Sequence, residues 1–168
     1  STSLLTSYYT GENVEARSKM ALASYLSGIT LANAGLGLVH GFASSIGGYF
    51  DIAHGILCSS LMAAANTVTI RKLRSENTNP GAIQKYATIG ELFSQKKSMT
   101  ADYYVDDFLS LLSNWTEQMN IPTLAQCGVL LTDYAKIVEA TDNKNNPVPL
   151  NRDEMMEVLE NACTRQQN

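Results

Sequence analysis

Apolar residues recur at intervals of three and four along most of this chain, and no segment shows the sustained apolar and polar alternation that marks a half-buried strand. The pattern predicts an all-α protein, a bundle of several helices. After a first helix ending near Tyr9, the predicted helices cover residues 14–34, 38–46, 52–74, 80–93, 101–119, 131–140 and 152–163. The segments between them are polar or rich in Gly, Pro and Asn, as turns and loops require.

A few residues predict where helices begin or end. Asn13 and Asp51 are of the types that accept a hydrogen bond from a free amide of a first helical turn, so we expect them to cap the helices that follow. Gly47 and Gly48 are expected to end the helix before them, because glycine adopts positive φ readily and suits a chain reversal.

One long segment is almost free of charge. No Asp, Glu, Lys or Arg occurs from Met20 to Phe50, and after Asp51 the charge-free run resumes from Ile52 to Ile70. That length could span a bilayer, but the run is dense in Gly, Ala, Ser, Thr and Asn rather than in the Leu, Ile and Phe that lipid favours. We therefore expect no membrane association, and instead helices buried on all sides of a soluble protein, where small residues let backbones approach closely.

Length and charge narrow the class of protein. The 168 residues predict a single domain over 1–168, and 12 basic against 16 acidic residues give a net charge of −4. Lys and Arg are not clustered as a phosphate backbone would require, which argues against nucleic acid as a partner. Three widely spaced cysteines, Cys58, Cys127 and Cys163, form no CxxC pair, so we expect no disulfide framework or zinc knuckle, and a cytoplasmic location.

The chain has two histidines, His40 and His54, in the segment GLVHGFASSIGGYFDIAHG. In one straight helix they would stand about 21 Å apart, too far to share a metal ion. A reversal at the two glycines would bring them together, so the spacing is compatible with a divalent metal, which binds imidazole nitrogen at about 2.0 to 2.2 Å. The alternative is that both are core histidines bonded to backbone carbonyls, because two ligands do not complete a site.

Two neighbouring residues could add chemistry. Cys58 follows His54 by one helical turn and could be a soft metal ligand, although a free cysteine on a helix of small residues is also typical of plain packing. Ser44 follows His40 by one turn, but a hydrolase would also need an orienting acid and an oxyanion hole, and the sequence places neither.

The order of motifs resembles the C-terminal half of the iron-containing alcohol dehydrogenases. That family has an Ala-Arg-x-x-Met helix, an Asn-Ala-Gly-x-Gly bend, then Val-His-Gly, Gly-Gly and a His-Gly that opens another helix. Ala16, Arg17 and Met20 match the first motif, the stretch 33–37 matches the second, and NNPVPLNRDEMMEVLENA is similar to the closing loop and last helix. The likeness covers most of the chain.

The resemblance implies an oxidoreductase fold of two parts, an α/β domain that binds NAD or NADP and a helical, dehydroquinate synthase-like domain that carries Fe²⁺ or Zn²⁺. This chain matches the helical part alone. His40 and His54 fall on the two late metal-binding histidines, while the family's earlier Asp and His ligands have no match here. The resemblance therefore implies an N-terminally truncated chain that is inactive alone, taken from a homo-oligomer acting on a small alcohol or aldehyde.

Ser44 occupies a position where the family often has a third histidine implicated in proton transfer. A hydroxyl can relay a proton but is a poor general base, so the candidate catalytic role implied for Ser44 is a relay. Two readings from other classes stay open: a helical interaction module in which both histidines are structural, and a helical protein that binds haem through them.

Overall fold

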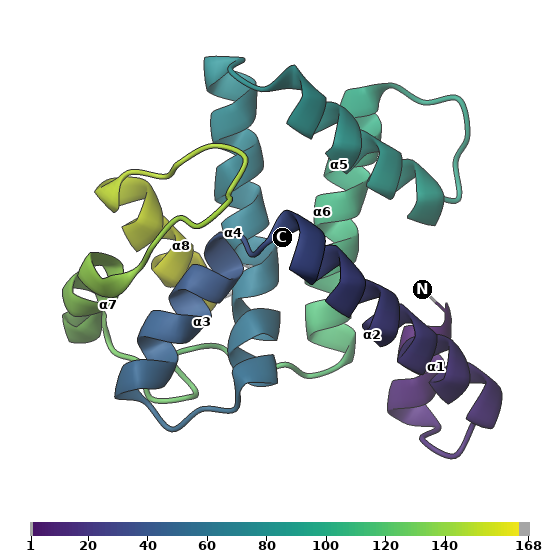
Figure 1. Cartoon of the computed structure of the whole chain (residues 1–168), viewed down its shortest axis with the longest axis horizontal. Helices are drawn as coiled ribbons and strands as arrows, with labels where there is room; N and C mark the ends of the chain where they lie inside the picture. Colours follow the sequence, from purple (N-terminus) through teal and green to yellow (C-terminus); the bar gives the residue numbers. More distant parts are fainter. Residues whose placement is uncertain (1, 165–168) are drawn as a thin grey trace. The chain divides into compact units, whose positions relative to one another are not determined.

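The computed structural model describes residues 2–164, and within that range it contains helices and no strand (Figure 1). The all-α prediction is confirmed. The elements are α1 (Thr2–Tyr9), α2 (Val14–Ala34), α3 (Leu38–Tyr49), α4 (His54–Glu76), α5 (Pro80–Phe93), α6 (Ala101–Gln118), the short 3₁₀ helix η1 (Leu131–Asp133), α7 (Tyr134–Ala140) and α8 (Arg152–Thr164). Most predicted boundaries agree to within two residues.

Contacts divide the chain into two compact units, Ser1–Leu36 and Gly37–Asn168. In the first unit, α1 packs against α2, and the Asn13 side chain accepts a hydrogen bond from the Ala16 amide at 2.9 Å, as a helix cap should. Gly35 ends α2 with φ of 73°.

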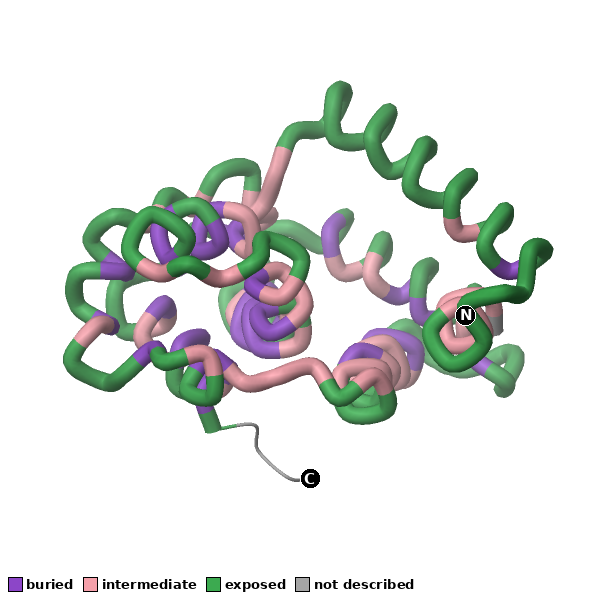
Figure 2. Tube along the Cα trace, turned by 90° about the horizontal axis from the view of Figure 1, so that it is seen from below, coloured by how far each residue is buried: buried purple, intermediate pink, exposed green. Residues whose placement is uncertain are grey.

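Within the first unit, α2 is not buried on all sides as expected for the charge-free helices. Ala16 is its one buried residue, and Figure 2 shows nearly all its turns as exposed. From Met20 onward α2 carries apolar and small residues on every side, yet it has no buried residue there, so an absence of charge does not ensure burial. No single helix among the described residues has the length and apolar character to cross a membrane; α2 and α3 meet that requirement only when taken together across their break.

The second unit is built around α4, which contacts α3, α5, α6 and α8. Buried apolar side chains from α3, α4, α7, α8 and the loops between them form one core cluster. Its fully buried large members are Leu38, Phe42, Ile46, Leu57, Leu61, Val68, Leu73, Leu124, Ile137, Val158 and Leu159. This core fixes α3 against the first half of α4.

Helices α5 and α6 pack closely against each other, and both contact α4 (Figure 1). Aromatic rings cross between them, with ring centroids 5.9 Å apart for Tyr86 and Phe108 and 5.5 Å apart for Phe93 and Trp115. The two backbones lie close together at Gly90, where a Cβ atom would overlap the backbone carbonyl of Tyr104.

The start of α8 is fixed by a reciprocal cap and by an ion pair to α4. The Glu154 amide donates to the Asn151 side chain at 3.0 Å, and the Asn151 amide donates to the Glu154 carboxylate at 2.7 Å. Lys72 on α4 donates to the same carboxylate at 2.7 Å, and these two side chains are only 11% and 20% exposed. Burial raises the pKa of Glu154, but the bonds from Lys72 and Asn151 outweigh it and leave that pKa below its ordinary value.

We expect Gly90→Ala to lower the free energy of unfolding by about 2 kcal/mol, because the new methyl group meets rigid backbone of α6. Gly48→Ala is the matched control, since a Cβ there meets nothing within 4 Å. The control should be unchanged or more stable by up to about 1 kcal/mol. Urea unfolding followed by circular dichroism measures both, and equal values for the two variants would contradict the close approach.

We expect Glu154→Gln to reduce stability near neutral pH by on the order of 1 kcal/mol. Because the folded-state pKa is lowered, the carboxylate contributes fully above about pH 4.3, the usual pKa of an unfolded Glu, and loses that contribution as pH falls through the folded value. The difference between wild type and variant should therefore shrink on acidification. Urea unfolding over a series of pH values tests this, and a difference that grows toward acid would refute it.

Candidate metal centre

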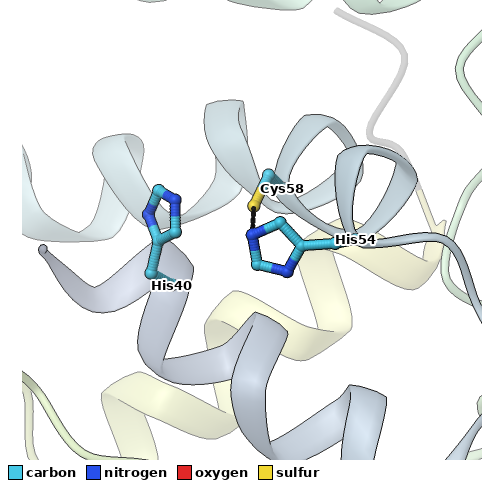
Figure 3. Close-up of side chains that lie close together, drawn as sticks. All are labelled: His40, His54 and Cys58. Carbon is cyan, nitrogen blue, oxygen red and sulfur yellow. Dashed lines mark hydrogen bonds between the residues drawn. The ribbon is translucent and has the colours of Figure 1, made fainter. Parts of the chain in front are cut away.

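The structure brings the two histidines together from different helices. His40 lies in the first turn of α3 and His54 is the first residue of α4, and their ring centroids are 5.5 Å apart. Figure 3 shows the two rings next to each other, one from α3 and one from the start of α4. The predicted reversal between them is present, so the two imidazoles can approach one point.

The reversal does not lie where the sequence predicted it. Helix α3 continues through Gly47 and Gly48 to Tyr49, and neither glycine has positive φ. The turn is made by residues 50–53, after Phe50 takes an extended conformation with its amide bonded to the Ile46 carbonyl at 2.9 Å. Glycine permits a helix to end but does not force it to, and nothing in the α3 backbone requires a break there.

Asp51 does not cap α4, which corrects a second prediction. The residue before the helix is Ala53, whose backbone carbonyl accepts from the Ile56 and Leu57 amides. Asp51 lies exposed in the connection, two residues too early to reach the first-turn amides as a cap. A cap of the right residue type must also stand at the residue where the helix begins.

Cys58 joins the two histidines, facing the same space from α4. It lies one helical turn after His54, with its sulfur 3.3 Å from His54 Nε2 (Figure 3). One ligand atom each from His40, His54 and Cys58 can be chosen so that all three lie within 4.8 Å of one another. The sequence left two alternatives open for Cys58, a metal ligand or a packing residue. Its position beside both imidazoles favours a place in the candidate metal centre over packing alone.

Burial affects the protonation of two members of this group. Desolvation, and then the neighbouring His54, lower the pKa of His40, which keeps its imidazole neutral and able to bind a metal at neutral pH. Desolvation raises the pKa of the Cys58 thiol. In the metal-free chain that thiol can donate its hydrogen to His54 Nε2.

Helix α3 is held in place on the side of the loop 141–151. A Cβ atom on Gly41, the residue after His40, would overlap the backbone carbonyl of Asp142. One turn further along, the buried Ser45 hydroxyl lies 2.6 Å from the Thr141 hydroxyl, which also donates to the Ile137 carbonyl at 2.7 Å. These contacts set where α3, and so His40, lies.

Ser44 is exposed on α3, one turn after His40. Its candidate catalytic role stays a prediction.

A cavity of about 230 Å³ adjoins His40, lined in part by Met62, Asn66, Tyr86 and Asn146. The Tyr86 hydroxyl donates to the Asn66 side chain at 2.9 Å, and burial raises the pKa of Tyr86 to about 12. Sequence reasoning missed this cavity. Its residues come from α3, α4, α5 and the loop 141–151, and no local motif links segments so far apart.

The fold and the centre together define a helical domain that presents two imidazoles and a thiol to one point. Comparison with known proteins identifies the class: the sequence model described as the Fe-containing alcohol dehydrogenase family, C-terminal, matches residues 1–163. This chain belongs to that family and corresponds to its C-terminal part.

Individual relatives agree with this assignment. The chain is 26% identical over 162 residues to the NAD-dependent methanol dehydrogenase of Bacillus methanolicus, covering 90% of this chain and 39% of that protein. It is 29% identical over 161 residues to the NADPH-dependent butanol dehydrogenase of Clostridium saccharobutylicum, with coverages of 90% and 39%. A crystal structure of 1,3-propanediol oxidoreductase superposes with a TM-score of 0.84 at 26% identity, covering 96% of this chain and 41% of that one. The chain thus spans about two fifths of the length of these relatives.

Proposed function

We propose that this chain supplies part of the metal site of an NAD(P)-dependent alcohol dehydrogenase, with His40 and His54 holding a divalent ion, Fe²⁺ or Zn²⁺. One observation carries the proposal. Two histidines separated by 14 positions in the sequence are brought to a ring separation of 5.5 Å by the packing of α3 on α4. The match of the family model to residues 1–163 supports the reaction class.

The donors present fit such an ion. Imidazole nitrogen binds both metals, and the lowered pKa of His40 keeps its ring in the neutral form that can do so. A bound divalent ion supplies Lewis-acid polarisation of an alcohol or carbonyl oxygen. His40 and His54 would fix where the ion, and with it the substrate oxygen, is held. Both rings are suited to this because they are carried by packed helices rather than by a loop.

The names of the relatives support the substrate and cofactor classes. They act on methanol, butanol and 1,3-propanediol, with NAD named for one and NADPH for another, so we propose a small alcohol or aldehyde and a nicotinamide cofactor. The cavity beside His40 is the candidate space for the carbon chain of the substrate. The exposed Ser44 hydroxyl is a candidate proton relay, not a base.

Metal binding, not turnover, is the property proposed for this chain by itself, since the family resemblance assigns the nicotinamide to another domain. Homo-oligomeric assembly and a cytoplasmic location remain predictions. The experiments below also test the two alternatives, that both histidines are structural and that they bind haem.

We expect the 168-residue chain to bind Zn²⁺, and Fe²⁺ under anaerobic conditions, in a calorimetric titration at neutral pH. His40→Ala and His54→Ala should each weaken binding at least about tenfold, because each removes a ligand. Asp51→Asn is the matched control: it removes a charge three residues from His54 but lies outside the ligand group, and it should bind as the wild type does.

Urea unfolding of the same variants separates the alternatives. If the histidines are structural, their replacement lowers stability and leaves any metal affinity unchanged. Absence of binding by the wild type, or binding that neither histidine variant alters, would overturn the proposal; a Soret band on adding haem would favour the haem reading.

A further inference from the structure

The position of Cys58 relative to His54 matches what a tetrahedral metal requires of neighbouring ligands. With Zn–N of about 2.1 Å and Zn–S of about 2.3 Å, a nitrogen and a sulfur ligand stand about 3.6 Å apart. The Cys58 sulfur and His54 Nε2 are 3.3 Å apart. The two residues lie four positions apart on α4, a spacing that puts side chains on one helical face.

The third side chain approaches the same point from the other helix. A ring nitrogen of His40 lies within 4.8 Å of both other ligand atoms (Figure 3). Two nitrogen ligands on a tetrahedral zinc ion stand about 3.4 Å apart, so an approach of at most about 1.4 Å separates the present arrangement from that spacing.

We propose that Cys58 is a third protein ligand, so that His40, His54 and Cys58 form a site that prefers Zn²⁺ to Fe²⁺. This inference rests on the proposed function, because it places the same ion on the same two histidines. It goes further in naming the ligand set and the metal that the set selects.

The donor chemistry gives the preference. Thiolate is a soft ligand that favours zinc, and for nitrogen and sulfur donors Zn²⁺ also stands above Fe²⁺ in the general order of divalent affinities. On binding, the thiol releases its proton to solvent and the sulfur donates an electron pair to the ion, with no change in oxidation state.

Three protein ligands with one open position is the arrangement found in catalytic zinc sites. His54 is exposed and both other residues are half-buried, so a water molecule or a substrate oxygen can reach the fourth position. Three donors from this chain alone are therefore enough for it to bind zinc in the experiment below.

The competing explanation of the short sulfur–nitrogen distance is a hydrogen bond from the thiol to His54 Nε2. A hydrogen bond and a metal ligand predict different spectra. Thiolate bound to Co²⁺, which replaces zinc in such sites, gives a near-ultraviolet charge-transfer band, whereas a thiol that only donates a hydrogen bond gives none.

The test is to load the 168-residue chain with Co²⁺, record its absorption spectrum, and then displace the cobalt with Zn²⁺ and, anaerobically, with Fe²⁺. The variants are Cys58→Ser and Cys58→Ala, with Cys127→Ser as the matched control, because Cys127 is also a half-buried free thiol but lies outside the ligand group. Circular dichroism checks that each variant is folded.

We expect the charge-transfer band in the wild type and in Cys127→Ser, and its loss in both Cys58 variants. Zinc affinity should fall at least about tenfold in the Cys58 variants, and the preference for zinc over iron should fall with it. Metal binding that requires the histidines but shows no band and survives Cys58→Ser would overturn this inference and leave the proposed function standing. No metal binding at all would overturn both.

Discussion

The packing of α3 against the first half of α4 is the constraint on which the candidate centre depends. Phe42 and Ile46 on α3 and Leu57 and Leu61 on α4 are each 0% exposed, so the two helices cannot separate without opening the core. The connection between them, residues 50–53, is only four residues long. The separation of His40 and His54 is therefore set by apolar burial, while the polar rings themselves contribute little to holding it.

The sequence predicts this helical architecture well, because helix signals are local. Asn13, Pro80 and Thr100 stand at helix starts as their residue types predict. Where a residue type merely permits a structure, the prediction was wrong: Gly47 and Gly48 allow a break, yet α3 runs through both. The prediction that α2 is buried on all sides was also wrong within its unit. A lack of charged residues describes the composition of a helix but does not show that another element packs against it.

The candidate centre could be predicted in part. A single reversal between two histidines is a local event, and the spacing of Cys58 from His54 is that of one helical turn, so the sequence indicates this group of side chains. The sequence spacing of Cys58 and His54 could not show whether the Cys58 thiol points toward the two imidazole rings. The cavity beside His40 could not be predicted at all, because it is lined by residues far apart in the sequence, among them Asn146, whose side chain donates to Thr69 and Val148 in the folded structure.

Gly41 shows how the position of a ligand can depend on a residue with no side chain. It directly follows His40, and the carbonyl of Asp142 occupies the space that any other residue would need there. Every substitution of Gly41, even the one to alanine, would therefore disturb the structure here. In a collection of random variants ranked by metal affinity, Gly41 would score alongside the ligands, although it has no donor atom in its side chain, because its replacement would displace the backbone that carries His40.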